Sequence, residues 1–140
     1  MKEQLNQVRE FQKAFKQTLN DRPTIIKWEE CLLRYNLGEE ELSEYHEAAY
    51  NDDMVEILDS LVDQAYILFG TVNAHGLQEQ FIKAFDLVHE NNMSKLDENG
   101  NVLKNDAGKV IKPAGFKPVD LKPLFDTDAS FRVEPIKIEE

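Results

Sequence analysis

Apolar residues recur every three or four positions through most of the first 96 residues, and this spacing limits the fold more than any other feature of the sequence. Residues 3–19 show it first and predict an amphipathic helix. The same spacing predicts further helices over residues 24–34, 39–50, 53–73 and 77–95. Asn36 and Gly38 lie between the first two of these, so the helix either continues or restarts there. We therefore expect an all-α fold, a four- to five-helix bundle.

The segment 53–73 has two apolar stripes rather than one, which predicts a helix that is mostly buried. Between the apolar faces runs an acidic stripe. Its members are Asp52, Glu56, Asp59 and Asp63. Acids on such a helix are typical of a cleft more than of a solvated face.

The composition changes after Leu96, where four of the five prolines lie. Residues 101–112 contain two short apolar and lysine-containing runs around the turn 105–108, which predicts a small β-ribbon. Leu121, Leu124 and Phe125 suggest an anchor after it. We expect a helical domain over residues 1–96 and a C-terminal arm over residues 97–140.

A chain of 140 residues is long enough for one domain with a core. No apolar run approaches the roughly 18 residues of a membrane-spanning helix, and the first residues lack the apolar stretch of a secretory signal. A cytoplasmic location is therefore expected. The single cysteine, Cys31, excludes an internal disulfide and a zinc site built from cysteines.

Charge is distributed very unevenly. The formal net charge is −11. Residues 35–82 contain no Lys or Arg but carry eleven Asp and Glu residues, which account for the whole excess. Such a chain repels phosphate backbones and anionic membrane surfaces, so no nucleic acid or membrane partner is expected. A concentrated acidic segment suits a cation, although a solvated acidic surface is the simpler explanation.

Two carboxylate pairs occur at helical spacing within this segment. Glu41 and Glu44 are three residues apart, as are Glu56 and Asp59, so each pair shares one helix face. Two such helices packed antiparallel would place four carboxylates around one space. Oxygen ligands without His or Cys favour Mg²⁺, with Mn²⁺ as the alternative. Asp63 lies one turn beyond Asp59 and is either a further ligand or an acceptor behind the ligands.

These motifs resemble a known family. The pattern E-E-x-x-E followed by E-x-x-D, matched by Glu40, Glu41, Glu44, Glu56 and Asp59, resembles the all-α nucleoside triphosphate pyrophosphohydrolases. That superfamily includes the MazG-like proteins, the dimeric dUTPases and phosphoribosyl-ATP pyrophosphohydrolase. Gly70-Thr71, the segment 88–95 and the lysine-containing segment 108–112 look closest to the phosphoribosyl-ATP pyrophosphohydrolase-like members. The resemblance covers about residues 5–96.

The resemblance implies an activity and a division of roles. Glu41, Glu44, Glu56 and Asp59 would hold Mg²⁺, and Glu40 would orient or deprotonate the attacking water. The implied reaction is Mg²⁺-dependent hydrolysis of a nucleoside or deoxynucleoside triphosphate to the monophosphate and pyrophosphate, by water attack at the α-phosphorus. Phosphoribosyl-ATP is a competing substrate. The family forms dimers or tetramers, so a homodimer or homotetramer is expected.

Charge that develops during phosphoryl transfer also needs protein cations. Lys95 and Asn92, three apart near the end of the last predicted helix, are the best local candidates for substrate binding, followed by Arg34. Each could equally be an ordinary solvated or helix-terminal residue. A non-catalytic helical protein whose acidic face binds a basic partner remains the rival function. The sequence does not identify the base, the sugar or the pathway.

Overall fold

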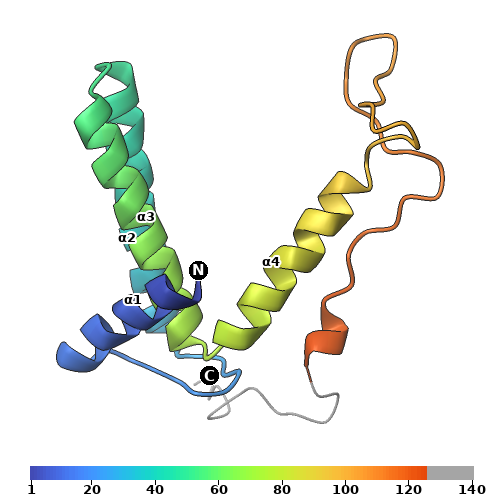
Figure 1. Ribbon diagram of the computed structural model, residues 1–140. Coiled ribbons are helices and arrows are strands. Elements are labelled where there is room, and N and C mark those ends of the chain that lie inside the picture. The colour runs from blue at the N-terminus through green and yellow to red at the C-terminus, as the bar shows by residue number, and fades with distance from the viewer. Residues whose placement is uncertain (126–140) are drawn as a thin grey trace, which may run out of the picture. The chain divides into compact units, whose positions relative to one another are not determined.

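The computed structural model describes residues 1–125 and shows four α-helices in that range (Figure 1). They are α1 (Lys2–Ala14), α2 (Trp28–Tyr50), α3 (Met54–Ala74) and α4 (Gln78–Met93), and a short 3-10 helix, η1 (Lys122–Leu124), follows. The all-α prediction is confirmed, with four helices. Residues 126–140, the last part of the predicted arm, lie outside the described residues.

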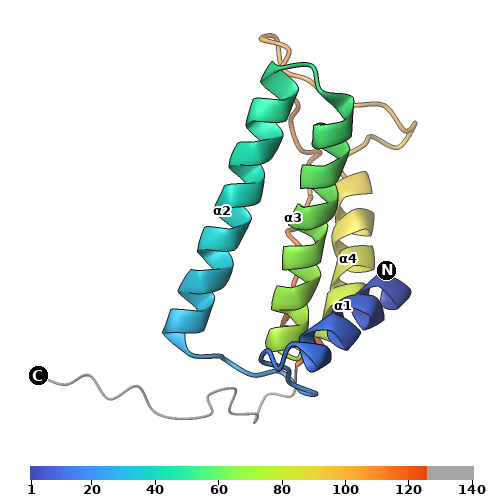
Figure 2. The ribbon, with the colours of Figure 1, turned by 90° about the vertical axis from the view of Figure 1, so that its left-hand side faces the viewer.

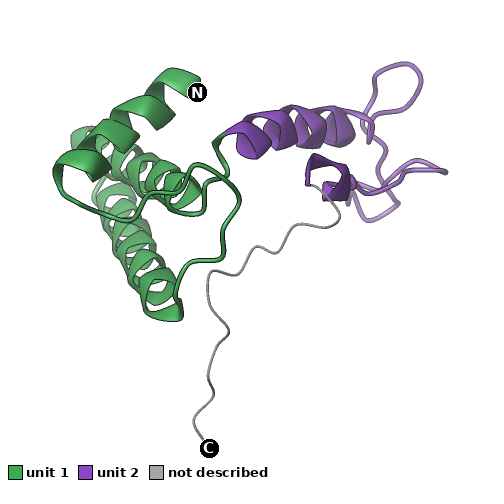
Figure 3. Ribbon diagram, turned by 90° about the horizontal axis from the view of Figure 1, so that it is seen from below, with its two compact units in different colours: residues 1–78, 130–140 green, residues 79–129 purple. Residues whose placement is uncertain are grey.

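The chain divides into two compact units (Figure 3). In the described residues the first spans 1–78 and holds α1 to α3, and the second spans 79–125. This division by compactness falls after Gln78, the first residue of α4, and the predicted domain boundary after residue 96 stays a prediction. None of the helices in residues 1–125 has both the length and the apolar character to cross a membrane.

Helices α2 and α3 form a hairpin and lie side by side (Figures 1 and 2). Helix α2 passes through Gly38 without a break, so the two helices expected over 24–34 and 39–50 are one. The connection is only three residues long. Its last residue, Asp53, caps α3, because its carboxylate accepts hydrogen bonds from the backbone N–H groups of Val55 (3.0 Å) and Glu56 (3.2 Å).

Two helix ends differ from the prediction. Helix α1 ends at Ala14 rather than residue 19, because Lys16 adopts a left-handed backbone conformation with φ 55°. Helix α2 begins at Trp28 rather than Thr24. The backbone N–H of Thr24 donates to the carbonyl of His75 (2.9 Å), and this tertiary contact holds the segment before α2 outside the helix.

A buried polar network joins α1 to α3. Asn73 is fully buried, and its amide donates to the carbonyl of Leu5 (3.0 Å) and to the side-chain oxygen of Gln12 (3.0 Å). Gln12, 1% exposed, donates in turn to the carbonyl of Gly70 (3.0 Å). These bonds fix the register of α1 against α3, since a shift would leave buried amides unpaired.

Gly76 follows the end of α3, and the backbone conformation at this position requires a glycine. Its φ is +65°, and a Cβ at this position would lie 2.1 Å from the carbonyl oxygen of Arg22. The chain before α2 can therefore run against the end of α3 only because residue 76 has no side chain.

The prediction that residues 53–73 form a mostly buried helix is wrong for this chain. Met54, Val55 and Leu58 are 74%, 74% and 63% exposed. The residues of α3 that are buried lie mainly at its C-terminal end, where α1 crosses it (Figure 2). The reason is that α1 reaches only that end, so one hairpin partner cannot cover two apolar stripes.

The second unit contains little regular structure beyond α4. The predicted β-ribbon is not shown as continuous strands within residues 96–125. In its place the described residues show two isolated antiparallel bridges, between Leu96 and Val102 and between Lys104 and Val110. The side chains of Val102 and Val110 are 52% and 54% exposed, so little apolar packing supports a longer pairing. The predicted anchor after the ribbon coincides with η1.

Candidate active site

The α2–α3 hairpin carries the acidic residues of both motifs. Because the two helices are antiparallel and packed together, acids from the second half of α2 approach acids from the first half of α3. Helix α2 supplies Glu40, Glu41 and Glu44, and α3 supplies Glu56, Asp59 and Asp63. The structure thus brings acids of two helices, at least twelve positions apart in sequence, into one acidic cluster.

Glu41 lies at the centre of this cluster. Its side chain is half-buried, and burial is the largest cause of a pKa above the ordinary carboxyl value. Repulsion from four other carboxylates raises the pKa of Glu41 further. In decreasing order these belong to Glu44, Asp63, Glu40 and Asp59. The order shows that acids of both helices act on one carboxyl group.

The charge of Glu41 has no protein counter-ion among the described residues. Its Oε2 atom is buried and has no hydrogen-bond partner. The nearby amide of Gln64 donates instead to the backbone carbonyl of Glu41 (3.4 Å). The ion pairs found within residues 1–125 are Arg9–Asp21 and Glu30–Arg34, neither of which involves the cluster. A buried carboxylate oxygen among like charges is unfavourable unless a cation neutralises it or a proton binds.

The donor chemistry of the cluster fits a hard divalent cation. All of its members are carboxylates, and oxygen ligands of this kind suit Mg²⁺ or Mn²⁺. In the described part of the chain, however, no three Asp, Glu, His or Cys side chains are placed closely enough to hold a metal ion. The four-carboxylate ligand set of Glu41, Glu44, Glu56 and Asp59 therefore stays a prediction.

Two members of the cluster differ from the others in burial or in their electrostatic effect on Glu41. Asp63, expected as a further ligand or an acceptor behind the ligands, is half-buried, and its charge acts on Glu41 more strongly than that of Asp59. Glu56, expected as a ligand, is exposed like Glu44 and Asp59 but, unlike them, is not among the residues that raise the pKa of Glu41. Its backbone N–H is bound by the cap residue Asp53, which places it in the first turn of α3.

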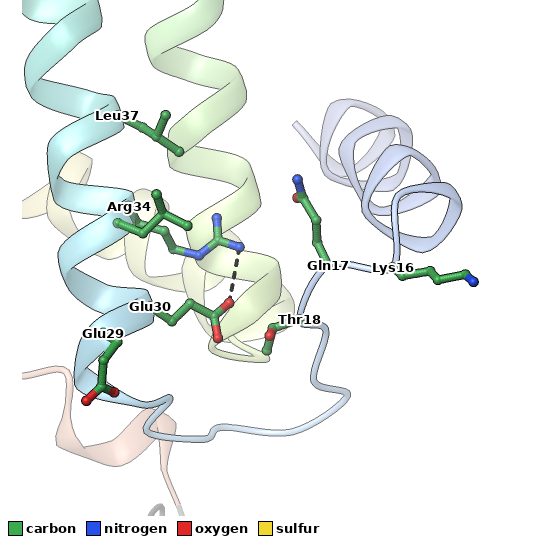
Figure 4. Close-up of a pocket in the computed structure, with 8 residues that line it drawn as sticks. Lys16, Gln17, Thr18, Glu29, Glu30, Arg34 and Leu37 are labelled. Atoms are coloured by element: carbon green, nitrogen blue, oxygen red, sulfur yellow. Dashed lines mark ion pairs between the residues drawn. The ribbon is translucent and has the colours of Figure 1, made fainter.

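Arg34 lies on α2 in the same unit and is mostly buried. Its side chain is 11% exposed, and its Nη2 atom is 3.6 Å from a carboxylate oxygen of Glu30 (Figure 4). Its Nε atom is buried without a partner. It lines a cavity together with residues 16–18 at the end of α1. Arg34 is therefore a fixed cation and not a solvated one.

Asn92 and Lys95 lie in the second unit and bind each other. The Nζ atom of Lys95 donates to the side-chain oxygen of Asn92 (2.7 Å) and lies 5.9 Å from the centre of the Phe116 ring. Lys112 approaches the same ring at 4.9 Å. Asn92, in the last turn of α4, and Lys95, just after the end of that helix, thus lie side by side, and their role in substrate binding stays a prediction.

Comparison with known proteins identifies a family for the region that carries this cluster. The family model described as phosphoribosyl-ATP pyrophosphohydrolase matches residues 8–92. The chain belongs to this family. The phosphoribosyl-ATP pyrophosphohydrolase family lies in the MazG-like nucleoside triphosphate pyrophosphohydrolase superfamily, so the resemblance found in the sequence is confirmed. Membership supports a nucleotide pyrophosphohydrolase-like activity that acts on pyrophosphate bonds. No curated protein matches the chain.

The match includes the whole acidic cluster, Arg34 and Asn92. Lys95 and the bridged segment that follows lie beyond its last residue. Arg34 also lies close to Gly70 of α3, where an added Cβ would be 3.2 Å from its Nη1 atom, and the sequence did not predict this proximity or the cavity beside it. One signal was present, since Arg34 and Glu41 are seven residues apart and therefore share a face of α2.

Proposed function

We propose that the chain is a Mg²⁺-dependent nucleotide pyrophosphohydrolase that cleaves a nucleoside or deoxynucleoside triphosphate to the monophosphate and pyrophosphate. Family membership supports the reaction class. The observation that carries the proposal is Glu41, whose buried, unpartnered oxygen is surrounded by the charges of four carboxylates from two helices. Phosphoribosyl-ATP, the substrate that gives the family its name, fits the same chemistry equally well.

The roles given to the residues are those that the family resemblance implies. Glu41, Glu44, Asp59 and Glu56 would hold Mg²⁺, with Asp63 beside them. Bound there, the cation would offset carboxylate repulsion and assist attack by polarising phosphate oxygens. Glu40, exposed on α2, would accept a proton from the attacking water. The new bond joins the water oxygen to the α-phosphorus, and the bond to the bridging oxygen breaks as pyrophosphate leaves.

A homodimer or homotetramer is part of the proposal. The support is the apolar surface that α2 and α3 leave exposed in one chain, with Leu33, Leu42, Val55 and Leu58 all more than half exposed. Large exposed apolar side chains on both helices are typical of a surface that another subunit covers. Sedimentation velocity at micromolar concentration should show more than one chain per particle. A single-chain particle would remove this part of the proposal.

The reaction is tested by pyrophosphate release from a panel of nucleoside triphosphates and phosphoribosyl-ATP. With Mg²⁺ present, Glu44→Gln and Asp59→Asn should each lower kcat by about a hundredfold or more, because each removes charge that holds the cation. Glu39→Gln is the matched control, since residue 39 lies about 200° around α2 from residue 41. Normal turnover in both cluster variants, or no turnover on any substrate with Mg²⁺, would contradict the proposal and favour the non-catalytic rival.

A further inference from the structure

A cavity of about 420 Å³ lies between the segment that follows α1 and the first half of α2. Its size is within the range of small-molecule sites, about 300–1,000 Å³. The residues that line it are Lys16, Gln17, Thr18, Glu29, Glu30, Leu33, Arg34 and Leu37. All of them belong to the first unit, and the proposed reaction gives this cavity no role beyond the candidate cation Arg34.

Arg34 is held at one wall of the cavity with unused hydrogen-bond donors. A Cβ on Gly70 would lie 3.2 Å from its Nη1 atom, so the glycine leaves room for the guanidinium against α3. The ion pair with Glu30 is long, at 3.6 Å, and the Nε–H has no partner. A buried guanidinium in this condition is costly unless an acceptor completes its hydrogen bonds.

The hydrogen-bonding side chains of Glu30 and Arg34 lie next to each other in the cavity. In Figure 4, Glu30 and Arg34 extend from α2 toward the segment that carries Gln17 and Thr18. Lys16 points away from this pair in the same view. A ligand in the cavity would therefore meet the donors of Arg34 and the carboxylate acceptor of Glu30 side by side.

Arg34, which lines the cavity, and Glu41, in the acidic cluster, share one face of α2. Arg34 and Glu41 are seven residues apart, which places them on one helix face and separates them by about 10 Å along the axis at about 1.5 Å per residue. Leu37 lies between them on the sequence and lines the cavity. A ligand with one end at Glu41 would therefore reach Arg34 along this one face of α2.

The lining favours an uncharged, hydrogen-bonding group over a phosphate. Two cations and two carboxylates line the cavity, and Glu30 already pairs with Arg34. A multiply charged phosphate would be repelled by Glu29 and Glu30. A base and sugar, in contrast, offer acceptors to Arg34, donors to Glu30 and an apolar face to Leu33 and Leu37.

We propose that this cavity binds the nucleoside part of the nucleotide whose phosphates reach the acidic cluster, with Arg34 donating to the base and Glu30 accepting from it. The assignment rests on the proposed function for the identity of the whole ligand. It makes Arg34 a specificity-determining residue and not a group that neutralises the leaving pyrophosphate.

The test measures binding without chemistry. Calorimetric titration of the full chain with the four ribonucleoside monophosphates, in EDTA, should show binding of at least one of them. Arg34→Gln and Glu30→Gln should each weaken that binding about tenfold or more, as expected for a lost hydrogen bond to a charged group. Lys27→Gln and Glu10→Gln, exposed residues outside the cavity, are the charge-matched controls and should bind as the parent chain does.

Kinetic measurements and titration with a second ligand, inorganic pyrophosphate, distinguish the possible results. With an active substrate, both cavity variants should raise KM and leave kcat within a few fold. Thermal melts show whether Arg34→Gln folds, and Glu30→Gln provides the test if it does not. The inference is overturned if monophosphate binding is absent or unchanged in the variants, or if inorganic pyrophosphate alone binds in an Arg34-dependent way. If no triphosphate is hydrolysed but monophosphate binding depends on both residues, the proposed reaction fails and the nucleoside site stands.

Discussion

Glu41 combines two properties that disfavour its charged form in the cation-free protein. Its side chain is half-buried with one oxygen unpartnered, and four carboxylates act on it. Both properties raise the pKa of Glu41, which means that the folded protein holds its charged form less well than the unfolded chain does. A divalent cation would remove both disadvantages at once, which is why this residue identifies the centre of the site.

Glu41→Gln should stabilise the protein in EDTA at neutral pH. Because the folded-state pKa of Glu41 lies above its unfolded value of 4.5, the folded protein binds the proton more tightly. The stability linked to Glu41 is therefore fully present below pH 4.5 and is lost as the pH rises through the folded pKa. Removing the charge of Glu41 should restore this stability. We therefore expect the Tm of Glu41→Gln to be a few degrees above that of the parent protein at pH 7 and equal to it at pH 4.

The matched control is Glu39→Gln, which removes an exposed charge from the same helix. It should leave the Tm within about one degree at both pH values. A Glu41→Gln protein that melts at or below the parent Tm at pH 7 would show that the acids around Glu41 do not repel it in the folded state.

At the scale of elements, local signals predicted some helix ends and non-local contacts decided the others. The predicted range 53–73 is close to the observed Met54–Ala74, which Asp53 caps and Gly76 follows. The end of α1 at Ala14 had no marker, since a lysine takes the left-handed conformation after it. The start of α2 depends on the bond from Thr24 to His75, which no local pattern shows.

The same distinction applies to the candidate site, where some features follow from local spacing and others depend on tertiary contacts. The pairs Glu41–Glu44 and Glu56–Asp59 follow from spacing within one helix. The closeness of Asp63 and Glu41, in contrast, depends on the register of α2 against α3. The burial of Arg34 likewise depends on Gly70 of the facing helix. Helical spacing predicts which residues share a face, but not which faces and levels meet.

Two glycine substitutions should have opposite effects on stability. Gly76→Ala forces a Cβ to within 2.1 Å of the Arg22 carbonyl at a positive φ, so we expect the free energy of unfolding to fall by about 2 kcal/mol or more. A Cβ on Gly38, within α2, meets nothing within 4 Å, so Gly38→Ala should raise it by about 0.5–1 kcal/mol. Urea unfolding measures both, and a neutral Gly76→Ala would show that the segment before α2 does not pack on the end of α3.

For the whole molecule, the uneven charge is the property that most constrains function. Residues 1–78 carry fifteen Asp and Glu against seven Lys and Arg, whereas residues 79–125 carry seven of each. The unit that holds the acidic cluster therefore repels a free triphosphate. A nucleotide can approach it only if cations accompany its phosphates, and a divalent ion shared by protein and substrate supplies that charge.

Binding of Mn²⁺ to the nucleotide-free protein, followed by water proton relaxation, tests the central claim most directly. The account predicts saturable binding that Mg²⁺ displaces, weakened by about tenfold or more in Glu41→Gln and Asp59→Asn and unchanged in Glu39→Gln. The account would be contradicted if Mn²⁺ bound the parent and the three variants with equal strength. It would also be contradicted if Mn²⁺ binding did not saturate below about 10 mM, which corresponds to a binding free energy of only about 3 kcal/mol.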